Sequence, residues 1–167
     1  ISGSIKIINF CRVNKIPLVY ASSCAIYGDI GYGNDKNSDF NPLNPYSADK
    51  LAMEIYAKTA FKLYGLPSIG LRFFNVYGPN QDPNNTYSGV ISKFINSISK
   101  NYKIQVNGGF QTRDFVFVGD VVKIIEASVE KVLNNLLCEQ INVLTGNSIS
   151  IEDLSSLLMK IIGKFPK

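Results

Sequence analysis

The chain has 167 residues, of which 46% are hydrophobic, so it can bury one domain-sized core. No apolar run approaches the roughly 20 residues that a transmembrane helix needs, and the net charge of +4 is scattered rather than gathered in a basic stripe. These features predict a soluble protein and argue against nucleic-acid and membrane partners. A modest positive charge suits an anionic small molecule equally well.

The sequence contains no histidine, which excludes histidine-based catalytic triads and the commonest zinc ligand. No metal site is expected. Tyrosine, lysine, serine and the carboxylates remain as candidate catalysts. The odd number of cysteines (Cys11, Cys24 and Cys138), without a CxxC pair or a secretory signal, indicates reduced thiols in a cytoplasmic protein.

The first half of the chain predicts helix, strand, loop and helix. Residues 1–15 read as a helix already under way at Ile1, which suggests a fragment, with Ile5, Ile8 and Cys11 on one face. A β-rich run at 16–23 precedes a loop rich in Gly, Asn and Asp at 28–44. The next helix, 45–64, has Asn44 as its cap and Gly65 as its end.

The second half continues this alternation, which implies a layered α/β fold with a mainly parallel sheet. Its apolar patterns predict a buried strand at 67–79, an amphipathic helix at 87–100, a short strand at 103–109, a strand running into a helix capped by Asp120 over 113–135, and a last helix capped by Ser150.

Two Tyr-x-x-x-Lys pairs occur, and their settings differ. The pair Tyr32 and Lys36 lies among turn formers, so we expect it in a loop. Tyr46 and Lys50 lie in the predicted helix, where residues four apart share one face, and a fixed ammonium favours the phenolate form needed by a general acid or base. Ser22, Ser23 and Asn75 are expected at strand ends, where ligands of parallel sheets collect.

Four segments occur in the order and approximate spacing of the extended short-chain dehydrogenase/reductase family: "YASSCAIYGD", "NPYSADKLAME", "YGLPSIGLRFFNVYGPNQDP" and "QTRDFVFVGDVV". The chain most resembles NAD-dependent nucleotide-sugar 4-epimerases, such as UDP-glucose and UDP-N-acetylglucosamine 4-epimerase. The resemblance implies a partial Rossmann-like, doubly wound sheet with part of the small substrate-binding region. Residues 1–79 would form the C-terminal half of the NAD-binding domain, and 80–167 substrate-binding segments interleaved with the remaining sheet and helices.

The resemblance also implies roles for individual residues. Tyr46 would be the catalytic acid/base, Lys50 would favour its phenolate and hydrogen-bond the nicotinamide ribose, and Ser23 would share the proton of the sugar's 4-oxygen with Tyr46. Phe74 would lie beside the nicotinamide of NAD. The implied reaction is hydride transfer from sugar C4 to NAD, rotation of the 4-keto sugar and return of hydride to the opposite face.

For the UDP-sugar, the resemblance implies that Asn75 and Arg113 bind the diphosphate, as suits a bidentate guanidinium. Val90, Gln105 and Asn107 would contact the nucleotide. Helices 1–15 and 46–64 would form a homodimer interface, and cell-surface polysaccharide precursors would be the usual destination of the product.

Several alternatives stay open. Ser22 and Ser23 are also ordinary strand-end residues, and Arg113 with Asp114 also reads as a surface ion pair. Cys24 and Ala25 replace the acidic pair typical of sugar 4,6-dehydratases, which disfavours dehydration, whereas UDP-glucuronate 4-epimerases and reductases remain possible. An unrelated α/β binding module ranks far behind.

The family's glycine-rich NAD motif has no counterpart in this sequence. We therefore expect most of the NAD site outside the chain. Two hypotheses follow. The chain is either part of a full-length epimerase or a non-enzymatic remnant or split-gene subunit of one.

Overall fold

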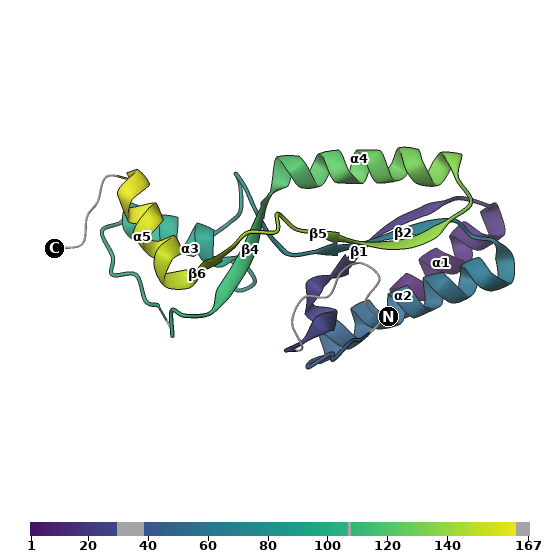
Figure 1. The fold of residues 1–167 in the computed structure, drawn as a ribbon, viewed down its shortest axis with the longest axis horizontal. Helices are drawn as coiled ribbons and strands as arrows, with labels where there is room; N and C mark the ends of the chain where they lie inside the picture. Colours follow the sequence, from purple (N-terminus) through teal and green to yellow (C-terminus); the bar gives the residue numbers. More distant parts are fainter. Residues whose placement is uncertain (30–38, 107, 163–167) are drawn as a thin grey trace. The chain divides into compact units, whose positions relative to one another are not determined.

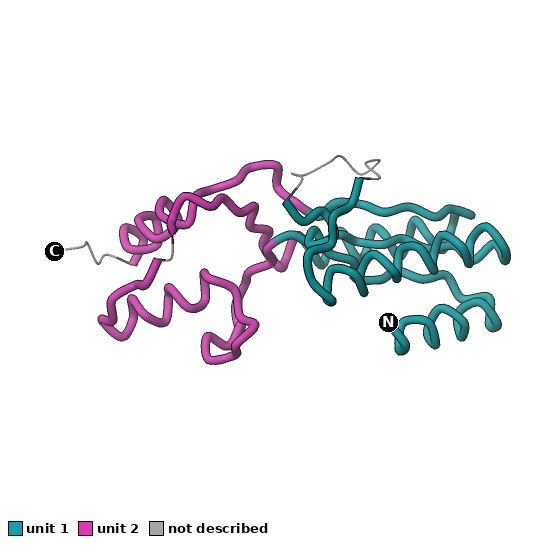
Figure 2. Tube along the Cα trace, turned by 90° about the horizontal axis from the view of Figure 1, so that it is seen from below, with its two compact units in different colours: residues 1–74, 121–143 teal, residues 75–120, 144–167 magenta. Residues whose placement is uncertain are grey.

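The structure is a computed structural model that describes residues 1–29, 39–106 and 108–162 (Figure 1). Two compact units divide the chain, and each is drawn from two stretches of sequence (Figure 2). The sheet unit contains Ile1–Phe74 and Val121–Val143, and the second unit contains Asn75–Asp120 and Leu144–Lys167. Residues 121–143, from the second half of the chain, belong to the sheet unit.

The sheet unit is built on three parallel strands in the order β1 (Leu18–Ser23), β2 (Ser68–Phe73) and β5 (Cys138–Val143). Helices α1 (Ser2–Asn14) and α2 (Pro45–Tyr64) lie on one face of the sheet, and α4 (Val118–Asn134) lies on the other (Figure 1). A parallel sheet covered by helices on both faces confirms the predicted α/β class.

Helix α2 begins and ends where the sequence predicts. The Asn44 side chain accepts a hydrogen bond from the Ser47 N–H at 2.9 Å, and the Ser47 hydroxyl accepts from the Asn44 N–H at 3.2 Å. This reciprocal cap satisfies two donors that would otherwise lack partners in the helix. Gly65 ends the helix with a φ of 65°, a left-handed conformation that glycine adopts without steric cost.

The hydrophobic core between α1, α2 and the start of β1 contains Ile8, Cys11, Ala60 and Leu66, against which Leu18 packs. Ile8 and Cys11 confirm the predicted apolar face of the first helix, and Ile5 is half-buried. At its other end β1 runs into a short 3₁₀ helix, η1 (Cys24–Tyr27), which turns the chain immediately after Ser23.

The second unit has a small mixed sheet. Strand β3 (Asn75–Tyr77) pairs in parallel with β4 (Thr112–Phe117), and β6 (Ser148–Ser150) pairs antiparallel with β4. Helices α3 (Val90–Ser99) and α5 (Ile151–Ile162) pack their apolar faces around Phe94, Ile151 and Leu154. As predicted, Ser150 caps α5, accepting from the Asp153 N–H at 3.0 Å.

Several predicted elements were wrong in detail. The strand predicted at 67–79 is two strands, β2 and β3, with Phe74 between them, so Asn75 begins a strand rather than ending one. Residues 103–106 and 108–109 form no strand, because β-prone residues need a neighbouring strand to pair with. Asp120 is not the cap of α4 but lies in its first turn. Strands β5 and β6 were not predicted.

The loop pair Tyr32 and Lys36 and the candidate residue Asn107 lie outside the described residues. None of the helices in the described ranges is long and apolar enough to cross a membrane.

Candidate functional site

Tyr46 and Lys50 share one face of α2, as the sequence predicts. The Lys50 ammonium nitrogen lies 5.6 Å from the centroid of the Tyr46 ring. The tyrosine is 57% exposed, so its hydroxyl is accessible to a ligand. An exposed phenol beside a fixed cation is an arrangement that general acid/base chemistry uses.

Lys50 also connects α2 to the strand that ends in Ser23. Its Nζ donates to the backbone oxygen of Ala21 at 2.9 Å. Ser23 is buried, and its Oγ accepts from the Ala25 N–H at 3.2 Å, which holds the hydroxyl at the start of η1. Since a hydroxyl has one proton and two lone pairs, the Ser23 side chain keeps its proton for donation.

A buried polar network lies beside this site, and the sequence analysis missed it. Glu54 and Arg72 are each 1% exposed and form a bidentate ion pair, with Nε to Oε1 at 2.9 Å and Nη2 to Oε2 at 2.8 Å. The Ser22 hydroxyl donates to the same Oε1 at 2.5 Å. On the other side, Arg72 Nη1 donates to the Tyr27 hydroxyl at 2.7 Å, which donates to Asn142 Oδ1 at 2.7 Å.

The electrostatics of the network follow from its burial. Burial disfavours the charged guanidinium of Arg72, but its interactions with Glu54, and after them those with Tyr27, more than offset this, so the pKa of Arg72 is raised. Tyr27 is fully buried and therefore packs within the protein rather than facing a ligand. The sequence held two signals for this network: a lone arginine inside an otherwise apolar strand, and a glutamate four residues after Lys50.

Phe74 and Asn75 differ in burial and in the unit to which they belong. Phe74 is buried in the sheet unit, where its N–H donates to the Val143 oxygen at 3.2 Å. Asn75 is half-buried in the second unit, and its Nδ2 donates to the Asp114 oxygen at 2.9 Å. Asn75 and Val90 line one cavity of roughly 220 Å³, so the structure brings these two predicted residues together.

Gln105 and Arg113 do not share that cavity. Gln105 lines a separate hollow of roughly 590 Å³ together with Val90. Arg113 is exposed on β4, and its Nη1 donates to the Thr112 oxygen at 2.8 Å. Its neighbour Asp114 is buried and accepts from the N–H groups of Thr145 and Gly146, at 2.9 and 2.8 Å, so Asp114 is not part of a surface ion pair.

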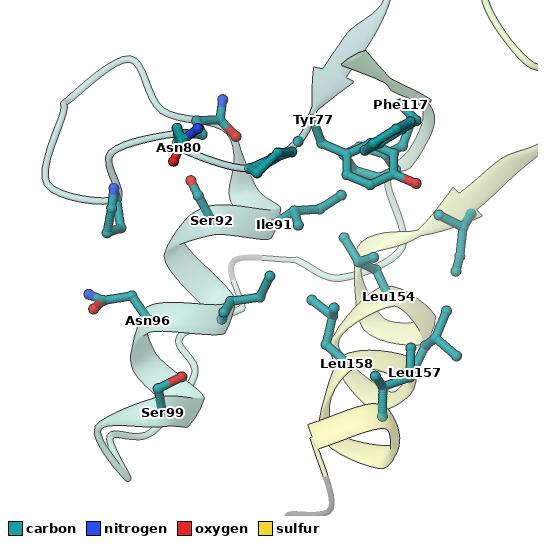
Figure 3. Close-up of a pocket in the computed structure, with 18 residues that line it drawn as sticks. Tyr77, Asn80, Ile91, Ser92, Asn96, Ser99, Phe117, Leu154, Leu157 and Leu158 are labelled. Atoms are coloured by element: carbon teal, nitrogen blue, oxygen red, sulfur yellow. The ribbon is translucent and has the colours of Figure 1, made fainter. Parts of the chain in front are cut away.

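A larger cavity of roughly 770 Å³ in the second unit contains none of the predicted site residues. Figure 3 shows Ser92, Asn96 and Ser99 of α3 on one side and leucines of α5 on the other, with Tyr77 and Phe117 at one end. In the sequence, the signal available for this cavity was the amphipathic pattern of the two helices that line it, α3 and α5. Across the ranges that the structure describes, no group of three or more metal-binding side chains comes together.

Comparison with known proteins identifies the family of the chain. The model of the NAD dependent epimerase/dehydratase family matches residues 1–143. The chain belongs to this family. A relative from Methanocaldococcus jannaschii, named "Putative UDP-glucose 4-epimerase", is 40% identical over 165 residues, which cover 96% of this chain and 52% of the relative.

Solved structures of family members resemble the chain closely. A UDP-N-acetylglucosamine 4-epimerase from Methanobrevibacter ruminantium, in complex with UDP-N-acetylmuramic acid, superposes with a TM-score of 0.89 at 33% identity, covering 98% of this chain and 53% of that one. A UDP-glucuronic acid 4-epimerase from Bacillus cereus, in complex with NAD, gives 0.85 at 28% identity, covering 98% and 53%. The chain thus spans about half the length of the relatives it matches.

Proposed function

We propose that the protein carrying this chain is an NAD-dependent nucleotide-sugar 4-epimerase acting on UDP-hexoses. The observation that carries the proposal is the pairing of the exposed Tyr46 with the Lys50 ammonium, 5.6 Å from its ring, on a helix that Lys50 ties to the strand ending in Ser23. Similar relatives named as UDP-sugar 4-epimerases support the same reaction class.

The donor set of these residues fits the ribose of a nicotinamide nucleotide. Lys50 has three N–H donors, one of which serves the Ala21 oxygen, and Tyr46 offers an exposed hydroxyl. NAD, when bound, would supply the acceptor and donor of the hydride at sugar C4. Tyr46 would take the proton of the sugar 4-hydroxyl and later return it, with Ser23 donating to the same oxygen as negative charge develops there.

For the remainder of the substrate, the second unit offers a graded set of candidates. Asn75 and Val90 line one cavity and are the strongest pair. The Asn75 side-chain amide has two N–H donors. One donates to the backbone oxygen of Asp114, so the other can donate to a diphosphate oxygen. Arg113 is exposed and suited to bidentate phosphate binding, and Gln105 and Asn107 complete the proposed nucleotide contacts.

The proposal includes a homodimer built on α1 and α2, because large apolar side chains lie exposed on these adjacent helices: Ile7, Phe10, Val13, Ile55 and Leu63. Phe10→Glu with Leu63→Glu should convert a dimer to monomer in equilibrium sedimentation. Leu133→Glu, at an equally exposed position on α4, is the matched control. A wild-type protein that sediments only as monomer would reject the dimer. Cys11, Cys24 and Cys138 form no disulfide within the described residues, which fits the proposed cytoplasmic location.

The direct test uses the protein expressed from its own gene, with NAD, and UDP-glucose, UDP-N-acetylglucosamine or UDP-glucuronate labelled with deuterium at C4. We expect the C4 epimer to form with the label retained, because oxidation and return of the same hydrogen keeps it, whereas simple proton exchange loses it. Tyr46→Phe should lower kcat by about 10²–10⁴-fold. Tyr64→Phe, on the same helix at 58% exposure, should not. Absence of any epimer from the wild type would favour the non-enzymatic alternative.

A further inference from the structure

We propose that Glu54, held by Arg72 and Ser22, is a positioning residue that fixes α2 against the end of β1 so that Tyr46, Lys50 and Ser23 serve one substrate. This inference rests on the proposed function. It assigns a task to the buried network, none of whose members is among the residues proposed to touch substrate or cofactor.

The first step is the spacing on α2. Tyr46, Lys50 and Glu54 follow one another at intervals of four residues, so they lie on one face of the helix, about 6 Å apart along its axis. Both side chains form hydrogen bonds with β1: Lys50 donates to the Ala21 oxygen, and Glu54 accepts from the Ser22 hydroxyl. Two neighbouring strand residues therefore bind two neighbouring turns of the helix, and Ser23 is the next residue of the same strand.

The second step is the position of the network in the sheet. Ser22, Arg72 and Asn142 are cross-strand neighbours in register, and each is the penultimate residue of its strand. Arg72 donates hydrogen bonds to Glu54 on α2 and to Tyr27 on η1. The hydrogen bonds thus connect all three strands, α2 and η1 at the carboxyl edge of the sheet, where ligands of such sheets bind.

The third step is energetic. A buried ion pair is weak evidence for stability, because replacing both partners by apolar residues of similar volume is often neutral or stabilising. A bidentate ion pair fixes the relative orientation of its two side chains, because its hydrogen bonds weaken steeply when the atoms shift. An apolar contact does not fix orientation in this way. Catalysis is sensitive to such shifts, because a misplacement of about 1 Å can cost about 10²-fold in rate.

The experiment compares variants that separate positioning from stability. Glu54→Met with Arg72→Met removes both charges and keeps volume, and Ser22→Ala removes one hydroxyl and leaves the ion pair. Glu139→Gln is the control, because it breaks an ion pair with Lys131 in the same unit whose partners are both exposed. Each is made in the protein expressed from its own gene and assayed with NAD and UDP-glucose, together with its urea unfolding midpoint.

We expect the double variant to keep a midpoint near wild type while kcat falls about 10- to 100-fold and KM stays within about threefold. Ser22→Ala should lower kcat less, about threefold, with KM unchanged. The Ala25 amide, which donates to Ser23 Oγ, should exchange its hydrogen faster in the double variant, a readout that needs no activity. Glu139→Gln should match wild type.

The inference is overturned if the double variant folds and both it and Ser22→Ala keep wild-type kcat and Ala25 exchange. If the double variant does not fold, Ser22→Ala and Tyr27→Phe decide alone: lower kcat at unchanged KM supports positioning, and unchanged kcat overturns it. Failure of the proposed function looks different, because the wild-type protein itself would then make no epimer, and the inference would fall with it.

Discussion

The two units of the molecule differ in the polar groups that they bury. Beside its apolar residues, the sheet unit buries an ion pair, Glu54 with Arg72, and the Ser22 hydroxyl that donates to it. The core of the second unit is built on Phe94, Ile151 and Leu154, packed by further aliphatic and aromatic side chains, and the one buried carboxylate described in this unit, Asp114, accepts hydrogen bonds from Thr145 and Gly146. Directional hydrogen bonds allow one arrangement, whereas apolar packing tolerates exchange of similar shapes. We therefore expect the Glu54–Arg72 network, in the unit that carries Tyr46 and Lys50, to tolerate substitution less well than the Phe94 core of the second unit.

The largest expected effect is the loss of one partner of the buried ion pair. Arg72→Met leaves the Glu54 carboxylate buried without its cation, which should lower the free energy of unfolding by about 3–5 kcal/mol. Urea denaturation followed by circular dichroism measures it. Glu54→Met with Arg72→Met should recover most of the loss, whereas Glu139→Gln at the exposed pair with Lys131 should cost about 1 kcal/mol or less. Equal losses in the single and double variants would contradict this account.

This pair also marks the limit of what the sequence predicts. Helix α2 was predictable because its signals are local: Asn44 and Pro45 at the start, Gly65 at the end. The partners Glu54 and Arg72 are 18 residues apart, and their pairing depends on how α2 packs on the sheet. Arg72 looks anomalous in the apolar run "SIGLRF", but nothing in the sequence names its partner.

Strands show the same division between local and non-local information. β5, "CEQINV", contains Glu139 and Asn142, residue types that are depleted in strands, and forms because β2 pairs with it, whereas "KIQV" contains neither type yet forms no strand. Gly70 is a further case. A Cβ there would lie 2.6 Å from the Tyr20 ring of the neighbouring strand, so the glycine makes room for a contact that only the sheet register creates.

For the proposed site, the sequence predicted the pairing of Tyr46 with Lys50 and the placement of Ser23 at the end of β1, because both depend on one helix and one strand. It did not predict that Asn75 and Val90 would share a cavity without Gln105 or Arg113, because side-chain positions in the second unit depend on packing between α3, β3 and β4.

In the second unit the corresponding test is truncation in the apolar core. Leu154→Ala should lower the free energy of unfolding by about 2–5 kcal/mol, because it leaves a cavity among Phe94 and Ile151. Leu154→Met keeps the volume and should cost less than about 1.5 kcal/mol. Both are measured by urea denaturation. If Leu154→Met lowers the free energy of unfolding as much as Leu154→Ala does, the core of the second unit tolerates substitution no better than the buried network of the sheet unit. The contrast between the two units would then be wrong.

A smaller effect concerns pH and the sheet unit alone. Burial, followed by the nearby Glu54 carboxylate, raises the pKa of Tyr20. Because the folded state holds this proton more tightly than the unfolded chain, the stability it contributes is fully present below the usual tyrosine pKa near 10 and is lost as pH rises above it. The free energy of unfolding should therefore fall by up to about 1.4 kcal/mol per pH unit from this group.

Tyr20→Phe isolates that contribution, since all other titrating groups are common to both proteins. The difference in unfolding free energy between wild type and Tyr20→Phe should be constant below pH 9 and should shift in favour of the variant by about 1 kcal/mol by pH 11. A difference that does not change with pH would mean that Tyr20 titrates alike in both states.

The smallest expected effects compare the caps of the two units. Asn44→Ala in the sheet unit and Ser150→Ala in the second unit each remove a side chain that accepts a backbone N–H, from Ser47 and Asp153 respectively, and each should cost about 1 kcal/mol of unfolding free energy. Their effects on activity should differ. Asn44 lies two residues before Tyr46, so fraying of that turn displaces the phenol from Lys50, and kcat should fall for Asn44→Ala but not for Ser150→Ala. Equal kcat values at equal stability loss would show that the first turn of α2 holds Tyr46 without its cap, leaving Lys50 and Glu54 as the anchors of the helix.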